Sequence, residues 1–233
     1  DQQGALFMKK HNELRSTPLF QGLSEDLLET ISRKALLRTY RAGEAVVNEE
    51  DPVRSLSVVL DGQVKLSKSS AEGREQTLTL LGPGDPFGLC TAFASNDFPA
   101  SAVTLKKTTI LTIPGSAVED IVRQEPMLLL NIIRVLSLRL KETMRLVESL
   151  ALKEIPQRVA SFILHDLAKQ DTGSQCSLEL AITHRELAKI IGATPEALSR
   201  ALKKMSEDGL LRVDGRMITV YDRKALKELA DGG

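Results

Sequence analysis

The stretch ITHRELAKIIGATPEALSRALKKMSEDGLLRVDGRMITVY (residues 182–221) decides the fold of the C-terminal part. Its apolar residues recur every three or four positions in two short runs, which predicts two amphipathic helices. Gly192 separates them, because glycine adopts the left-handed conformation that ends a helix at little steric cost. The strand-like residues that follow flank Asp214-Gly215, which predicts a hairpin with its two-residue turn there. Two helices, a turn and a β-ribbon indicate a winged helix.

Both helices carry start signals in the sequence. Thr183 is a residue of the N-cap type, and Glu186 stands three positions later, where a capping box needs its carboxylate. Thr194 precedes the second helix, with Pro195 at the first helical position and Glu196 in the first turn. These local signals predict the starts of both helices.

The second helix has the composition of a DNA recognition helix. Four apolar residues at helical spacing should face the core: Leu198, Ala201, Leu202 and Met205. The residues expected to point outward are Glu196, Ser199, Arg200, Lys203 and Lys204. Such a face can bridge to guanine, exchange hydrogen bonds with bases and bind phosphates. Similar helix pairs occur in ordinary helical domains, where a basic cluster is only a solvated face; the hairpin favours the DNA-binding interpretation.

Composition limits the class of protein. The chain has 233 residues, of which 42% are apolar, so it can bury a sizeable core and is long enough for two domains. Its 31 basic and 31 acidic residues cancel, so DNA affinity must come from a local patch. Cys90 and Cys176 show no zinc or iron–sulfur spacing, which predicts no metal site and a reducing cytoplasm. No apolar run is long enough to span a bilayer, and the first residues lack the pattern of a signal peptide.

The N-terminal half has a period of two rather than 3.6. Strands are expected at residues 56–60, 64–67, 76–81 and 108–113, with turn signals between them. Many short strands at this spacing predict an antiparallel β-roll or jelly roll. A helix at residues 24–34 precedes the roll, and another is expected at residues 116–124.

A long helix is predicted at residues 126–152. Apolar residues alternate at spacings of four and three along it, as in a coiled coil. The seam comprises Leu129, Ile133, Leu136, Leu140, Thr143, Val147 and Leu150. A homodimer is the expected consequence, since a two-fold axis would place two recognition helices about one DNA turn apart. The alternative is a helix that lies on the roll and buries this stripe within its own chain.

The predicted fold class is therefore α+β, in three parts. Residues 19–125 form the sensing β-roll with flanking helices, residues 126–152 the dimerisation helix, and residues 153–233 the winged helix-turn-helix. The last part begins with a helix at residues 157–169. Lys153, Glu154 and Pro156 mark the joint, which is the natural hinge.

This order of parts resembles the CRP/FNR family of bacterial transcription factors. The resemblance covers nearly the whole chain from about Leu19. It rests on LDGQVKL with Gly62, GPGDPFG at residues 82–88, ILHDLAKQD at residues 163–171, and the winged-helix unit. It implies a regulator, not an enzyme, that binds double-stranded DNA as a homodimer, with RNA polymerase as a further partner.

The same resemblance assigns roles in DNA binding. Glu196, Ser199 and Arg200 match the E-x-x-S-R form of the oxygen- and nitric-oxide-responsive branch. Glu196 and Arg200 should then contact a C·G pair, and Ser199 a neighbouring thymine, in a TTGA-type half-site of an inverted repeat. The phosphate-contacting residues expected beside them are Thr183, Arg185, Thr194, Lys203 and Lys204.

The residues expected to bind the effector differ from those of the cyclic-nucleotide-binding members of the family. Cyclic-nucleotide-binding members carry a glycine-glutamate pair for the ribose and an arginine-serine pair for the phosphate. Here those places hold Gly88-Leu89 and Pro99-Ala100, so cAMP and cGMP are not expected. Iron–sulfur members use several cysteines near the N-terminus, and this chain has none there.

The pattern PFGLCTAF…FPASAVTL resembles instead the nitrosative-stress branch, which is associated with haem. The candidate effector pocket comprises Phe87, Gly88, Leu89, Cys90, Pro99 and Ala100. Candidate axial donors to haem are Met8, His11, Cys90 and Met127. Cys90 is also a candidate redox thiol, although between Leu89 and Phe93 a small core residue is the simpler expectation. Glu50 stands where a turn glycine is usual, which predicts a reshaped turn.

Two other functions are compatible with a β-roll. A roll of this kind could be a metal-dependent cupin enzyme, but residues 36–114 contain no histidine to hold the metal. A regulatory protein that binds a ligand through the roll and a protein through the C-terminal domain is the remaining alternative. The wing and the Glu196, Ser199 and Arg200 triplet favour DNA over that alternative.

Overall fold

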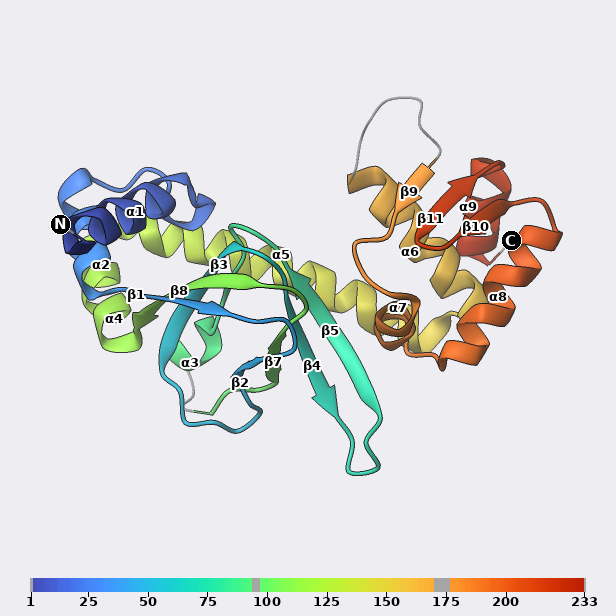
Figure 1. The fold of residues 1–233 in the computed structure, drawn as a ribbon, viewed down its shortest axis with the longest axis horizontal. Helices are drawn as coiled ribbons and strands as arrows, with labels where there is room; N and C mark the ends of the chain where they lie inside the picture. The colour runs from blue at the N-terminus through green and yellow to red at the C-terminus, as the bar shows by residue number, and fades with distance from the viewer. Residues whose placement is uncertain (1, 94–96, 170–176, 233) are drawn as a thin grey trace. The chain divides into compact units, whose positions relative to one another are not determined.

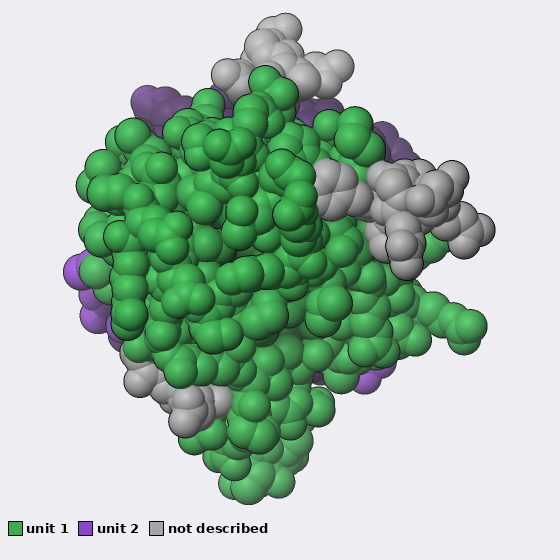
Figure 2. Space-filling view, turned by 90° about the vertical axis from the view of Figure 1, so that its left-hand side faces the viewer, with its two compact units in different colours: residues 1–74, 78–141 green, residues 75–77, 142–233 purple. Residues whose placement is uncertain are grey.

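The computed structural model describes residues 2–93, 97–169 and 177–232. They belong to two compact units, coloured separately in Figure 2: residues 1–74 with 78–141, and residues 75–77 with 142–233.

Eight strands in the described part of residues 36–114 form two four-stranded sheets (Figure 1). The first has the order β1 (Leu36–Tyr40), β8 (Thr108–Pro114), β3 (Ser55–Asp61) and β6 (Pro86–Phe87). The second has the order β2 (Ala45–Val47), β7 (Ser101–Thr104), β4 (Val64–Ser69) and β5 (Glu75–Leu81). Strand β8 pairs antiparallel with both neighbours, so that Leu111 faces Leu37 of β1 and Val58 of β3. The predicted antiparallel roll is confirmed.

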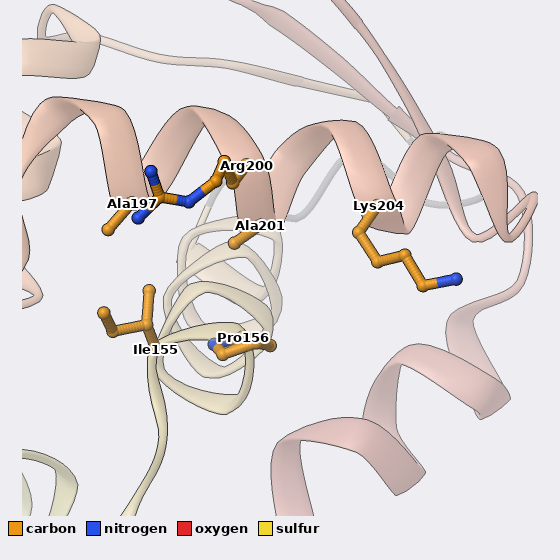
Figure 3. A pocket seen from close by; sticks show the side chains of 6 residues that line it. All are labelled: Ile155, Pro156, Ala197, Arg200, Ala201 and Lys204. Atoms are coloured by element: carbon orange, nitrogen blue, oxygen red, sulfur yellow. The ribbon is translucent and has the colours of Figure 1, made fainter.

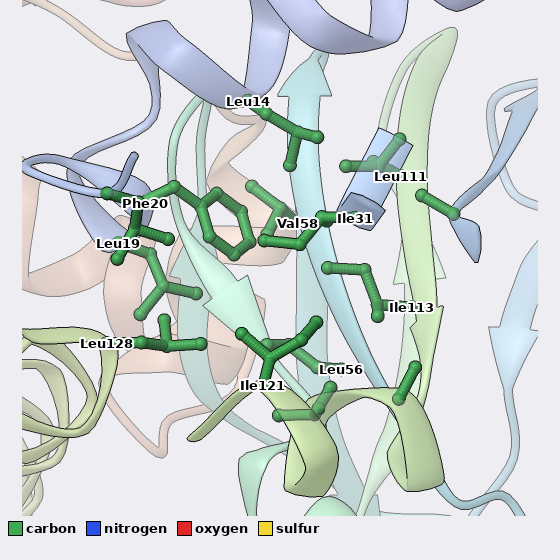
Figure 4. Close-up of a cluster of buried hydrophobic side chains, with 14 of the residues drawn as sticks. Leu14, Leu19, Phe20, Ile31, Leu56, Val58, Leu111, Ile113, Ile121 and Leu128 are labelled. Atoms are coloured by element: carbon green, nitrogen blue, oxygen red, sulfur yellow. The ribbon is translucent and has the colours of Figure 1, made fainter. Parts of the chain in front are cut away.

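The roll buries two apolar clusters because successive side chains of a strand point to opposite faces. Leu56 and Val58 of β3 belong to one cluster, and Val59 belongs to the other. The first cluster packs under helices (Figure 4) and includes Leu14, Leu19, Phe20, Ile31, Leu111, Ile113, Ile121 and Leu128. The second comprises Tyr40, Val47, Val59, Val64, Leu81, Phe87, Phe98, Ala100, Ala102 and Ile110.

Helices around the first cluster include one that the sequence did not predict. The predicted helices appear as α2 (Glu25–Lys34) and α4 (Gly115–Gln124). The additional helix, α1 (Gln2–Ser16), is followed by a 3-10 turn, η1 (Pro18–Phe20). Leu14 of α1 is fully buried. The short helix α3 (Leu89–Phe93) follows β6.

Glu50 takes the backbone conformation that a turn glycine would supply. Its φ is 68°, and no other non-glycine residue in the described ranges has a positive φ. Its amide donates to the Phe98 carbonyl at 2.9 Å, and the Asn48 amide donates to the Asp51 carboxylate at 2.7 Å. These bonds hold a left-handed conformation that is unfavourable for a residue with a side chain.

The long helix α5 (Pro126–Leu152) has the predicted bounds. Leu128 and Ile132, outside the seam, are buried against the first cluster, and Asn131 donates to the Leu19 carbonyl at 3.0 Å. The seam residues Leu129, Ile133, Leu136, Leu140 and Val147 are instead 42 to 63% exposed, and Thr143 is exposed too. The alternative of a stripe buried within its own chain is therefore wrong for these six residues. Leu150 is half-buried.

The C-terminal part is a winged helix. It contains α6 (Ile155–Lys169), β9 (Ser177–Glu179), α7 (His184–Ile190), α8 (Pro195–Glu207), β10 (Leu211–Asp214), β11 (Met217–Val220) and α9 (Arg223–Asp231). The sheet order is β10-β11-β9. Strand β9 and helix α9 were not predicted. Asp222 caps α9 by accepting the Ala225 amide at 2.9 Å.

The hairpin is confirmed, but its turn lies one residue later than predicted. Asp214 pairs with Met217, so the loop residues are Gly215 and Arg216. Gly215 has φ 58°, while Arg216 has no positive φ, which is the pattern of a type II′ turn. Asp214 is thus the last strand residue rather than the first loop residue.

Candidate nucleic-acid interface

Helix α8 is built as its sequence predicts. The Thr194 hydroxyl accepts the Ala197 amide at 3.2 Å, and Pro195 occupies the first helical position. The four predicted core residues, Leu198, Ala201, Leu202 and Met205, are all buried. This packing fixes which face of α8 is turned outward.

The turn before α8 packs tightly. Thr183 caps α7 by accepting the Glu186 amide at 3.2 Å, and Gly192 has φ 64°. A Cβ atom at Gly192 would lie 2.7 Å from Leu150 Cδ2 and 3.4 Å from Arg158 Nη1. The turn therefore favours glycine for its left-handed conformation, and a Cβ there would displace the Leu150 methyl group.

The predicted base-contacting residues share the outward face of α8. Glu196, Ser199 and Arg200 are exposed, as are Lys203 and Lys204. None of the first three forms a side-chain hydrogen bond or ion pair with another residue that the structure describes. Arg200 and Lys204 line an open hollow together with Ile155 and Pro156 of α6 (Figure 3). The three polar groups are thus available to an external partner.

The two lysines of α8 have acidic neighbours that sequence reasoning missed. Lys204 donates to Asp208 at 2.8 Å, and Lys203 lies 3.8 Å from Glu207. The hydrogen bond from Lys204 to Asp208 raises the pKa of Lys204 above its usual value. Both pairs have the i,i+4 spacing that brings side chains together on a helix, so the signal was present in the sequence. They reduce the positive charge that this end of α8 offers to phosphates.

The remaining predicted phosphate ligands lie at helix starts. Thr183 precedes α7, Arg185 is in its first turn, and Thr194 precedes α8. All three are exposed. Each capping hydroxyl accepts an amide and keeps its own proton to donate to a phosphate oxygen.

The candidate effector residues do not form one group. Phe87 and Ala100 belong to the second cluster of the roll, and Phe87 packs edge-on against Phe98 at 6.4 Å between ring centres. Leu89 is buried in the first cluster. Gly88 lies between them with φ 83°, and a Cβ there would approach the Ser55 carbonyl to 2.4 Å. Pro99 is exposed.

Cys90 is exposed, so the expectation of a small core residue is wrong. Of the other candidate haem donors, the two methionines are exposed, whereas the His11 side chain is largely buried. Met8 of α1 is 57% exposed, and Met127 at the start of α5 is 38% exposed. His11 Nε2 lies 2.9 Å from the Glu25 carboxylate. Cys176 falls outside the described residues.

No helix within the described ranges is both long and apolar enough to cross a membrane.

Two family models match the two halves of the chain. The cyclic nucleotide-binding domain matches residues 37–125, and the Crp-like helix-turn-helix domain matches residues 157–229. The cyclic AMP receptor protein of Thermus thermophilus is 30% identical over 219 residues, which cover 94% of this chain and 99% of the relative. The chain belongs to the CRP/FNR family. It is a DNA-binding transcription regulator of that family.

Other known proteins are similar to this chain over most of its length. The CRP-like cAMP-activated global transcriptional regulator of Mycobacterium tuberculosis is 27% identical over 216 residues, 91% of this chain and 96% of the relative. The solved structure of the c-di-GMP responsive regulator CLP from Xanthomonas campestris has a TM-score of 0.74 at 26% identity, covering 85% of this chain and all of that one. A CooA mutant from Carboxydothermus hydrogenoformans shares the fold, with a TM-score of 0.77 at 24% identity and coverage of 90% and 92%. The predicted fold class is confirmed.

Proposed function

We propose that the protein regulates transcription by binding an inverted repeat of TTGA-type half-sites as a homodimer. The observation that carries this proposal is the exposed, unpaired triplet Glu196, Ser199 and Arg200 on α8. The planar fork of arginine matches O6 and N7 of guanine, and a glutamate carboxylate accepts from N4 of cytosine. Together they suit one C·G pair, with Ser199 beside them for the thymine.

The half-site is tested by fluorescence anisotropy with the full-length protein. The probes are a TTGA palindrome and a set in which each half-site base pair is changed in turn. Each change at a contacted pair should lower affinity by about 1–3 kcal/mol, or roughly 5- to 150-fold. A flat profile across the four positions would contradict the proposed half-site.

The homodimer is supported by the exposed seam of α5. A row of apolar side chains that are 42 to 63% exposed on one helix is typical of an interface, and its spacing fits a second copy of the same helix. A two-fold pair also matches the symmetry of an inverted repeat. RNA polymerase is the further partner proposed at the promoter.

Sedimentation velocity tests the dimer. The full-length protein should sediment as a dimer at micromolar concentration. Leu140→Glu should shift it to a monomer, because a carboxylate at the seam would be desolvated against its own copy. Lys141→Glu places the same side chain one residue off the seam and serves as the matched control. A wild-type monomer would refute the dimer.

The proposed signal is not a cyclic nucleotide, although two relatives are named for cAMP. Where cyclic-nucleotide-binding members carry a glutamate for the ribose, Leu89 is buried among apolar side chains. Where they carry the serine of the phosphate pair, Ala100 is buried. Isothermal titration with cAMP and cGMP should therefore show no binding at millimolar nucleotide. A micromolar affinity for either would overturn this part of the proposal.

A nitric-oxide signal read through haem, or a redox signal, is proposed instead. The candidate donors are distributed over α1, α3 and α5, and the described residues hold no group of three or more His, Cys, Asp and Glu that could bind a metal ion. Haem, when bound, would be held by side chains from this set of candidate donors and would supply the site at which nitric oxide binds. An absorption spectrum with haem should show a Soret band that shifts on adding nitric oxide. An unchanged spectrum of free haem would exclude the haem form of the signal.

A further inference from the structure

Arg158, in the first turn of α6, donates to three backbone carbonyls that belong to two separate segments. Its Nε donates to the Lys153 carbonyl at 2.8 Å, its Nη2 to the Leu150 carbonyl at 2.9 Å, and its Nη1 to the Ile191 carbonyl at 3.1 Å. Leu150 and Lys153 lie at the end of α5 and just after it, and Ile191 is the C-cap of α7. One guanidinium therefore binds the ends of two helices at once.

These carbonyls need such a donor. The last carbonyls of a helix have no amide one turn ahead to accept from, and a cation near them is favourable because that end of the helix carries partial negative charge. If the helix continued, the Glu154 amide would donate to the Leu150 carbonyl. That amide donates instead to the Gln157 side chain at 2.7 Å. The planar, forked guanidinium offers donors in several fixed directions, which a lysine does not.

The turn after Ile191 also packs closely against the end of α5. Gly192 follows Ile191, and the position of its missing Cβ is 2.7 Å from Leu150 Cδ2. Helix α8 begins at Pro195, three residues after Gly192. A shift of the end of α5 against Arg158 would therefore displace the turn and, through it, the recognition helix.

We propose that Arg158 is a positioning residue for DNA binding. It fixes the orientation of α8 relative to the end of α5, and so sets the distance between the two recognition helices of the dimer. The inference rests on the proposed homodimer and its inverted repeat. It adds a residue that touches no DNA and yet selects the spacing of the half-sites.

The test compares Arg158→Gln with the wild type in full-length protein on three classes of DNA. These are the palindrome, palindromes with one base pair added or removed between the half-sites, and a probe with one half-site scrambled. Affinity for the palindrome should fall at least tenfold, and the preference for its spacing should flatten. Affinity for the single half-site should change less than twofold.

Two further variants make the result specific. Arg158→Lys keeps the charge without the fork and should lie between wild type and Arg158→Gln, which also covers the case in which the glutamine variant folds poorly. Lys224→Gln removes an exposed cation from the same unit, paired at 3.8 Å with Glu228, and should leave all three affinities unchanged. Urea denaturation curves give the folded fraction of each variant under the binding conditions.

Equal losses on the palindrome and on the single half-site, or an unchanged spacing preference, would overturn the role of Arg158. A wild-type protein that binds both probes equally would overturn the proposed dimeric function, and this inference with it. The two failures are distinguished because only the first occurs with a wild type that prefers the palindrome.

Discussion

The outward face of α8 and the corner formed by β6 and α3 differ in what they offer to a partner. On α8, the side chains assigned to base contact are exposed and unpaired. At the corner, Phe87 and Leu89 are buried in two different apolar clusters. The two regions lie in the two parts of the chain that the family models match. The face of α8 therefore presents accessible polar groups to a partner, whereas the side chains of Phe87 and Leu89 at the corner are inaccessible.

The largest effect expected is at Leu89, where the family's ribose-binding glutamate would stand. Leu89→Glu should lower the free energy of unfolding by about 3–5 kcal/mol, because it buries a carboxylate without a partner. The loss should shrink at acidic pH, where the carboxyl group is neutral. Urea denaturation at neutral and acidic pH measures both.

Leu89→Met is the matched control, and it should cost less than about 1.5 kcal/mol since it keeps the volume and polarity of the site. If Leu89→Glu is as stable as the control and gains affinity for cAMP, the corner is a preserved nucleotide site and the contrast with α8 is wrong.

A smaller effect is expected at the turn that places α8. Gly192→Ala should destabilise the protein by about 1–3 kcal/mol, because the alanine would hold a left-handed φ and its Cβ would collide with Leu150. Gly209→Ala provides the control: its φ is 72°, but nothing lies within 4 Å of its Cβ position. The difference between the two urea midpoints isolates the collision, and equal midpoints would show that Leu150 can move away.

The smallest effect is expected at Lys203, whose side chain is 78% exposed and lies near Glu207. Lys203→Ala should weaken binding to every sequence alike and reduce the slope of log affinity against log salt by about one. Anisotropy titrations at several salt concentrations, on the palindrome and on random DNA, measure the slope. A loss of affinity confined to the palindrome would indicate that Lys203 contacts a base rather than a phosphate.

The features that could be predicted from the sequence are those that local signals specify. Helix α5 was predicted with its bounds because Pro126 and a regular apolar spacing are local signals. The winged-helix core followed from Thr183, Gly192, Thr194 and Pro195 for the same reason. Family resemblance then supplied the roles on α8, which periodicity alone left as a choice between a recognition helix and a solvated face.

Other features depend on tertiary packing that local patterns do not encode. Leu89 and Cys90 are neighbours in one short helix, yet one is buried and the other exposed, so the hydrophobic neighbours of Cys90 misled the prediction. Helix α9 was missed although Asp222 caps it, because no long apolar run follows. The bonds of Arg158 reach carbonyls up to 33 residues away in sequence, and no spacing rule predicts them.

The sequence specificity of Arg200→Ala shows whether Arg200 reads a base pair of the half-site. Competition anisotropy compares wild type and variant on the TTGA palindrome, on the palindrome with the G·C pair changed, and on random DNA. The variant should lose roughly 1–3 kcal/mol of preference at that pair and keep its affinity for random DNA. Equal losses of affinity on the palindrome and on random DNA would contradict it.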